Sequence, residues 1–172
     1  MKKRVIVIIA VAAVAFCACA AIVFTSFLGL FNRPRVYALD FSAPGMRLTL
    51  TNEFTEASLD HYTACFEKED VRVLALEDPY SETEGLEAYT AEEYGTRLLA
   101  ENGLDAALET DDGLTAFSYI YTDPDTGDNY YYYSVITKGS DAFWTVQFTT
   151  PLKNEHKYQD EFVKWAKTIE VY

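Results

Sequence analysis

The sequence predicts an α+β protein in which a transmembrane helix precedes one domain with a mainly antiparallel meander sheet flanked by helices. Three observations lead to this prediction. Residues 5–31 contain no charged side chain. Short runs of alternating apolar and polar residues, separated by turn residues, are typical of antiparallel strands. Two later segments, after Thr90 and after Pro151, repeat apolar residues at the spacing of a helix face.

The N-terminal region predicts a single-pass membrane anchor. About 20 apolar residues suffice for a helix to cross a bilayer, and the uncharged segment 5–31 exceeds this length. More basic residues precede the segment than follow it: Lys2, Lys3 and Arg4 against Arg33 and Arg35. Because basic residues are enriched on the cytoplasmic side of a membrane, we expect residues 1–4 to be cytoplasmic and the rest of the chain after the span to be extracytoplasmic.

Two alternatives to an uncleaved anchor remain open. Ala18-Cys19-Ala20 supplies the small residues of a signal-peptide cleavage site, and Cys19 is the residue that lipidation would use. Either kind of processing would leave apolar residues, such as Phe24 and Phe31, near a new N-terminus in water. The uncleaved anchor is therefore the preferred interpretation, and it suits a protein of a bacterial cell membrane.

The rest of the chain divides into a short linker, 32–36, and one extracytoplasmic domain, 37–172. The chain has 14 basic and 27 acidic residues, and five of the basic ones lie within the first 36 residues, which leaves the domain with a net charge of −18. Such a charge repels phosphate backbones and excludes nucleic-acid binding. We expect the domain to be monomeric.

Two hairpins begin the domain. The first joins residues 39–41 to residues 46–50 through a turn that contains a Pro-Gly pair. The second joins residues 62–67 to residues 71–76 through charged turn residues. Apolar residues occupy both faces of the strand 71–76, so we expect it to be covered above and below.

Two helices are predicted to flank the sheet. Thr90 and Glu93 have the spacing of a capping box, in which each side chain accepts a backbone N–H of the other residue. The Asn-Gly pair at 102–103 is a typical helix end. The second helix follows Pro151. Its apolar residues share one face, because they are spaced by four, three and four positions: Tyr158, Phe162, Trp165 and Ile169.

The segment 117–136 predicts a long hairpin. Its turn begins at Asp123-Pro124, where the aspartate bonds forward to the backbone and the proline fixes φ, and Gly127 supplies a positive φ. The loop starts like a calcium-binding loop but lacks the glycine and glutamate that such a loop needs at its sixth and twelfth positions. We therefore expect a plain turn and no metal. The strand 142–149 follows and is apolar on both faces.

Four motifs resemble the PsbP and Mog1-like α/β/α sandwich family. They are SAPGMRLTLTNEF (42–54), DGLTAFSYIY (112–121), AFWTVQF (142–148) and FVKWAKTIEV (162–171). The resemblance implies a sheet between two helical layers and a role in binding or assembly. The motifs are structural, so no functional residue is carried over from the family.

The long hairpin also holds the candidate binding residues. Consecutive tyrosines fall on alternate faces of a strand, and exposed aromatic rings supply contact area at interfaces. The aspartates nearby favour a protein partner with basic and apolar character. The candidate residues are Tyr130, Tyr131, Tyr132, Tyr133, Asp123, Asp125 and Asp128. The alternative is that these rings are core residues beneath a helix.

The sequence favours a membrane-tethered binding or assembly module without catalysis, because we recognise no pattern of catalytic, cofactor-binding or metal-binding residues. The alternative is a thiol-dependent enzyme. His61 and Cys65 would share a strand face, where an imidazole can activate a thiol. The apolar neighbours of Cys65 favour instead an inert, buried thiol.

Overall fold

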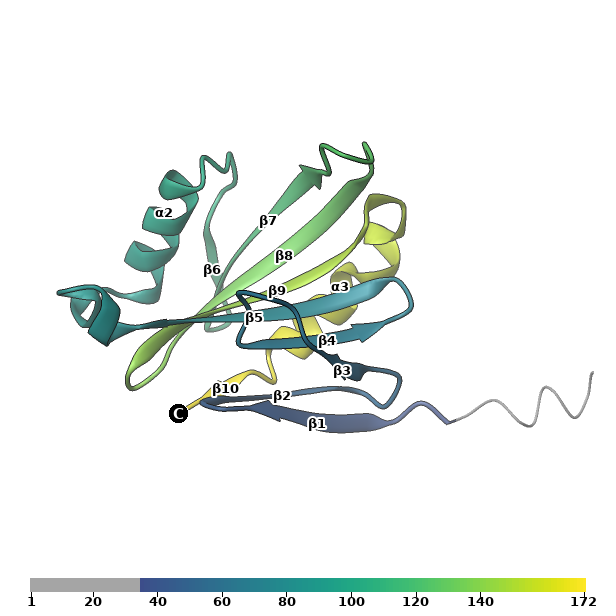
Figure 1. The fold of residues 1–172 in the computed structure, drawn as a ribbon, viewed down its shortest axis with the longest axis horizontal. Helices are drawn as coiled ribbons and strands as arrows, with labels where there is room; N and C mark the ends of the chain where they lie inside the picture. The colour runs from purple at the N-terminus through teal and green to yellow at the C-terminus, as the bar shows by residue number, and fades with distance from the viewer. Residues whose placement is uncertain (1–34) are drawn as a thin grey trace, which may run out of the picture. The chain divides into compact units, whose positions relative to one another are not determined.

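The computed structural model describes residues 35–172, of which Tyr37–Tyr172 form one compact unit (Figure 1). The anchor predicted for residues 5–31, the basic N-terminus 1–4 and most of the linker 32–36 lie outside the described residues. Within residues 35–172, no helix is both long enough and apolar enough to span a membrane.

Seven antiparallel strands form the main sheet, in the order β3-β4-β5-β9-β8-β7-β6. Their bounds are β3 Thr55–Ala57, β4 Ala64–Lys68, β5 Val71–Pro79, β6 Glu109–Asp111, β7 Leu114–Thr122, β8 Asn129–Lys138 and β9 Ala142–Pro151. The expectation of a single meander needs correction, because β3–β5 and β6–β9 are two meanders joined where β5 pairs with β9. Strand β9 is buried on both faces, whereas β5 leaves Arg72 and Leu76 exposed on one face, so the cover expected above and below residues 71–76 is present only in part.

The first predicted hairpin belongs to a second, smaller sheet. Strands β1 (Ala38–Ala43) and β2 (Met46–Thr51) pair as expected, and β10 (Glu170–Val171) adds to the other edge of β2. Gly45 has a φ of +83° in the turn, and a Cβ there would lie 2.8 Å from the Trp144 ring. This turn thus requires glycine both for its backbone conformation and for the close approach of the indole.

Helix α2 spans Ala91–Glu101 and begins with the predicted capping box between Thr90 and Glu93. Helix α3 spans Glu155–Ala166 and follows a short 3-10 turn, η3 (Leu152–Asn154). Two further 3-10 turns, η1 (Tyr80–Glu82) and η2 (Leu86–Ala88), precede α2.

The helices lie on opposite faces of the main sheet. On one face, α3 buries Phe162 and Trp165 against Phe148 of β9. On the other, Tyr94 of α2 stacks on Phe143 with the ring centroids 4.3 Å apart. The result is an α/β/α sandwich, in which α2 lies over one end of the sheet (Figure 1).

Candidate functional site

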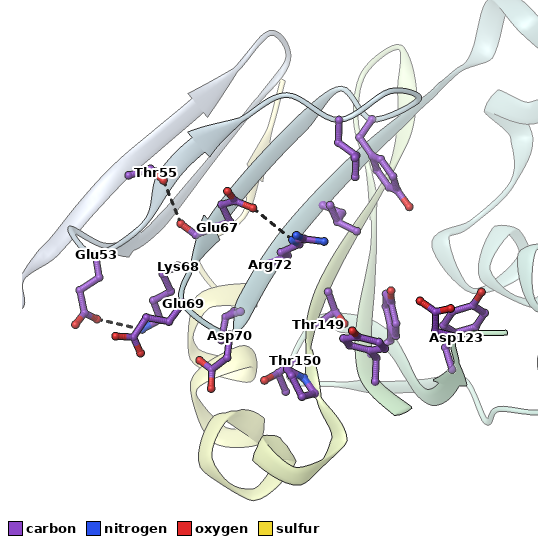
Figure 2. A pocket seen from close by; sticks show the side chains of 18 residues that line it. Glu53, Thr55, Glu67, Lys68, Glu69, Asp70, Arg72, Asp123, Thr149 and Thr150 are labelled. Atoms are coloured by element: carbon purple, nitrogen blue, oxygen red, sulfur yellow. Dashed lines mark hydrogen bonds and ion pairs between the residues drawn. The ribbon is translucent and has the colours of Figure 1, made fainter. Parts of the chain in front are cut away.

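A cavity of about 710 Å³ lies on the face of the sheet that α2 covers only in part. Its floor comes from the ends of β4, β5, β9, β8 and β7 that lie away from α2, and the loop between β3 and β4 supplies Leu59 and Tyr62. Three regions line it: a wall of tyrosines, a central ion pair and an end rich in carboxylates (Figure 2).

The tyrosine wall is built by strand register. Tyr121 pairs with Tyr130, and Tyr119 pairs with Tyr132, so all four rings project from the same face. Tyr119 and Tyr132 stack with their centroids 5.0 Å apart, and Tyr121 stands nearly perpendicular to Tyr132 at 6.3 Å. Burial raises the pKa of Tyr119 to about 12 and also raises the pKa of Tyr132, so both hydroxyls are neutral hydrogen-bonding groups at physiological pH.

Polar groups lie beneath and beside this wall. Gln147 of β9 donates from Nε2 to the Tyr119 hydroxyl and to Ser134 Oγ, at 3.3 Å in each case. Arg72 of β5 also lines the cavity and pairs with Glu67 of β4 at 3.4 Å (Figure 2). The cavity therefore combines aromatic rings with hydrogen-bonding groups and a solvent-exposed ion pair.

Of the three candidate aspartates, Asp123 alone lines the cavity. Its Oδ1 accepts the backbone N–H groups of Asp125 and Thr126, at 2.8 and 3.2 Å, and its backbone carbonyl accepts the N–H of Gly127. This confirms the predicted turn. Asp125 and Asp128 are exposed at the hairpin tip. Within residues 35–172, no cluster of three or more His, Cys, Asp or Glu side chains could hold a metal ion.

The structure separates the four consecutive tyrosines into two roles. Tyr131 is 5% exposed and stacks on Phe162 of α3, and Tyr133 is half-buried on the same face. These two rings belong to the helix-covered side, as the core alternative expected. Tyr130 and Tyr132 lie on the opposite face and line the cavity.

The carboxylate-rich end of the cavity is closed by contacts between the β4–β5 turn and α3. The Lys68 ammonium lies 5.1, 5.6 and 5.2 Å from the ring centroids of Phe54, Tyr158 and Trp165, and 3.1 Å from the Glu53 carboxylate. The hydrogen bond from Lys68 lowers the pKa of Glu53.

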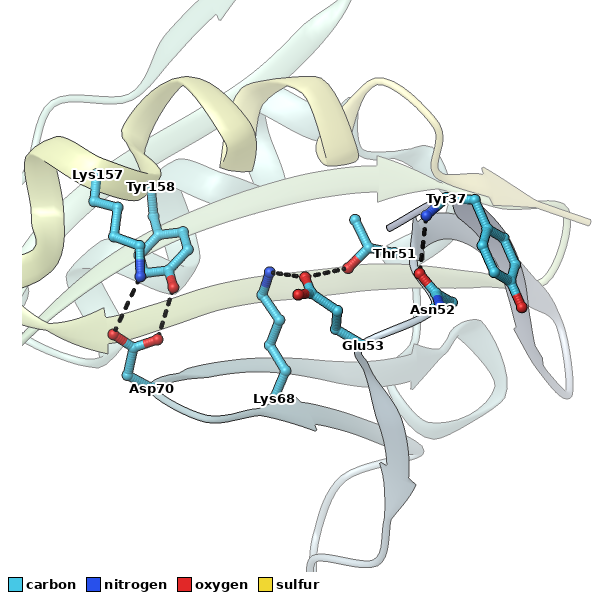
Figure 3. Close-up of polar contacts among 8 residues, drawn as sticks. All are labelled: Tyr37, Thr51, Asn52, Glu53, Lys68, Asp70, Lys157 and Tyr158. Carbon is cyan, nitrogen blue, oxygen red and sulfur yellow. Dashed lines mark hydrogen bonds and ion pairs between the residues drawn. The ribbon is translucent and has the colours of Figure 1, made fainter. Parts of the chain in front are cut away.

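Asp70, in the same turn, accepts hydrogen bonds from the Tyr158 hydroxyl at 2.7 Å and from Asn154 at 2.6 Å. Figure 3 shows the Lys68–Glu53 ion pair and the contacts of Asp70 with Tyr158 and Lys157. Together they fix α3 to the β4–β5 turn at one end of these strands.

The alternative of a thiol-dependent enzyme placed His61 and Cys65 on one strand face, and that geometry is wrong. Strand β4 begins at Ala64, and His61 lies in the preceding loop with a φ of +72°, so the two residues do not share a strand face. Cys65 is 4% exposed, and burial raises the pKa of its thiol. This direction is opposite to that of an activated cysteine.

Sequence reasoning missed Tyr62, Arg72 and Tyr121 as cavity residues, and it missed Tyr119 as the ring that stacks on Tyr132. The alternation of Tyr119 and Tyr121 with Ser118 and Ile120 was a usable signal for the strand face. The contributions of Tyr62 and Arg72 depend on long-range strand pairing, for which the sequence carries no local signal.

No protein-family model and no curated protein matches this sequence. The structure is similar to the solution structure of cyanobacterial PsbP from Synechocystis, with a TM-score of 0.52, 15% identity, and coverage of 82% of this chain and 96% of that one. A crystal structure of a Bacteroides thetaiotaomicron protein has a TM-score of 0.50 and 13% identity, over 78% of this chain and 48% of that one. The Saccharomyces cerevisiae Ran-binding protein Mog1p has a TM-score of 0.47 and 9% identity, over 81% of this chain and 96% of that one. The similarity to PsbP confirms the fold predicted from the four sequence motifs.

Proposed function

We propose that residues 37–172 form a non-catalytic binding module, held at the outer side of a cell membrane by the segment 5–31, and that the tyrosine-lined cavity is its binding surface. The proposal rests on one observation. On the part of the sheet face that α2 leaves open, tyrosine side chains line the cavity. Tyr121 is 45% exposed there. Partly exposed tyrosines next to hydrogen-bonding groups are typical of surfaces that bind partners.

The charge of the cavity favours a protein partner with basic and apolar residues. Five acidic and two basic side chains line it. Both basic side chains already face carboxylates, in the pairs Lys68–Glu53 and Arg72–Glu67. The excess of carboxylates attracts a basic partner and repels an anionic one, which also speeds encounter with the correct partner.

Site-specific photo-crosslinking in the full-length protein, expressed in its native membrane, tests this proposal. A photoreactive amino acid replaces Tyr121 in one variant and Ile120 in the control. Ile120 is 58% exposed and projects from the opposite face of the same strand. We expect a discrete crosslinked partner from position 121 and none from position 120. The absence of a crosslink at 121, or equal crosslinks from both positions, would show that this face is not the binding surface.

A further inference from the structure

We propose that the cavity binds an extended segment of the partner, in which one arginine and one apolar side chain face the sheet an even number of positions apart, at least six. This inference rests on the proposed function and names the class of partner that the cavity accepts. Three features of the cavity carry it: a carboxylate oxygen beside tyrosine rings that makes no hydrogen bond with the described residues, an apolar region on the far side, and the distance between the two.

The carboxylate is that of Asp123. The turn uses its Oδ1 for two backbone N–H groups, and Oδ2 makes no hydrogen bond with the described residues. Tyr121 and Tyr130 line the cavity next to it. A guanidinium is planar, stacks on aromatic faces and donates to a carboxylate at the same time, whereas an ammonium is a compact and more strongly hydrated charge. The combination of tyrosine rings and a carboxylate therefore selects arginine over lysine.

The apolar region lies at the other side of the cavity. Leu59 is 44% exposed, and it lines the cavity together with Tyr62 from the same loop and Leu74 of β5. These side chains surround a space that suits an aliphatic or aromatic residue. Arg72 and Glu67 lie closer to this region than to Asp123, and they neutralise one another.

The distance between the regions sets the spacing in the partner. Leu74 lies on β5 and Tyr121 on β7, three strand intervals apart. Three intervals of about 4.8 Å give ~14 Å across the strands. The register places Leu74 level with Phe117, four residues before Tyr121, which adds ~13 Å along the strands. The two side chains therefore start ~19 Å apart, which an extended segment spans with about six residues at ~3.3 Å each. Arg72 is paired with Glu67 at 3.4 Å, and this pairing reduces its repulsion of the bound arginine. Residues an even number of positions apart share one face of an extended segment.

Selection from a phage-displayed library of random dodecapeptides, with the purified full-length chain in detergent as bait, tests the inference. We expect enriched peptides to hold an arginine and an apolar residue separated by six or eight positions. A synthetic copy of an enriched peptide then provides the affinity measurement, by fluorescence anisotropy. Replacing its arginine by the neutral isostere citrulline should weaken binding about tenfold, the loss expected for one charge-assisted hydrogen bond.

Two variants of the protein locate the contact. Asp123→Asn removes the charge but keeps the Oδ1 that the turn requires, and it should weaken binding to a similar degree. Asp125→Asn is the matched control, because Asp125 lies in the same turn but does not line the cavity; its affinity should equal that of the unmodified protein. The citrulline peptide leaves the protein unchanged and so decides the question even if Asp123→Asn is unstable.

Enriched peptides without arginine, or equal binding to Asp123→Asn and the unmodified protein, would overturn the inference. If such peptides still compete with the partner crosslinked at Tyr121, the proposed binding surface stands and only its preference for arginine is wrong. Failure to enrich any peptide overturns the inference as well, while the crosslink decides the proposed function separately.

Discussion

Replacing Lys68 by methionine should destabilise the domain, because this lysine holds α3 and the β4–β5 turn together. Its ammonium lies within 5.6 Å of the centroids of three rings, Phe54, Tyr158 and Trp165, and its side chain is 13% exposed. Methionine keeps the apolar stem but removes the charge. A desolvated cation–π contact contributes up to about 2 kcal/mol, whereas the ion pair with the half-exposed Glu53 contributes about 0.5 kcal/mol. We therefore expect Lys68→Met to lower the free energy of unfolding by about 2 kcal/mol.

Urea unfolding of the full-length chain in detergent, followed by tryptophan fluorescence, measures this change. Glu53→Gln removes the ion pair alone and should cost about 0.5 kcal/mol. Lys164→Met is a second control, because Lys164 is an exposed lysine of α3 that pairs with Glu161 and has no ring contact among the described residues. A free energy of unfolding for Lys68→Met equal to that of either control would refute the role of the three rings.

Four further predictions concern the core, the cavity, the thiol and the anchor. Trp165→Ala should lower the free energy of unfolding by about 3 to 5 kcal/mol, since it empties a large buried site; an unchanged melting temperature would remove α3 from the core. Burial raises the pKa of Tyr119 to about 12, so its hydroxyl loses the proton at lower pH in the unfolded chain than in the folded one. The free energy of unfolding should therefore fall as the pH rises from 10 toward 12. Equal free energies of unfolding at pH 9 and pH 11 would contradict this. Cys65 should resist alkylation until the protein unfolds; rapid labelling at neutral pH that slows in His61→Ala would favour a thiol-dependent enzyme instead. The intact chain should sediment with membranes through segment 5–31; a shortened, soluble form in the medium would show that the anchor is cleaved.

Local signals predicted most of the elements. The capping box at Thr90 and the Asp123 turn depend on residues a few positions apart, and both are present in the structure. The spacing of Tyr158, Phe162 and Trp165 correctly gave the buried face of α3, whereas Ile169, predicted on the same face, lies beyond the end of the helix at Ala166. In each case the physical cause, a capping hydrogen bond, a turn or a helical period, lies within one short segment.

Strand order and the cavity depend on contacts that are distant in sequence. The pairing of β5 with β9 joins segments separated by α2 and the long hairpin, so alternation within either strand could not reveal it. The alternation of side chains along a strand correctly placed Tyr130 and Tyr132 on one face of the sheet and Tyr131 and Tyr133 on the other. Which of these faces stays open depends on how far the 11-residue helix α2 extends over the sheet. Covering only one end of the sheet, this helix leaves Tyr132 and Arg72 beside an open cavity.

Quantitative affinity purification from the native membrane tests the central claim most directly, with the full-length chain as bait. One bait is unmodified, one carries Tyr121→Ala together with Tyr130→Ala, and one carries Ile120→Ala on the opposite face of the same strand. Thermal melts establish that all three baits are folded. We predict that the double variant loses the partner recovered by the unmodified chain while Ile120→Ala keeps it. Recovery of the same partner at the same level by a folded double variant would contradict the claim that the tyrosine-lined cavity is the binding surface.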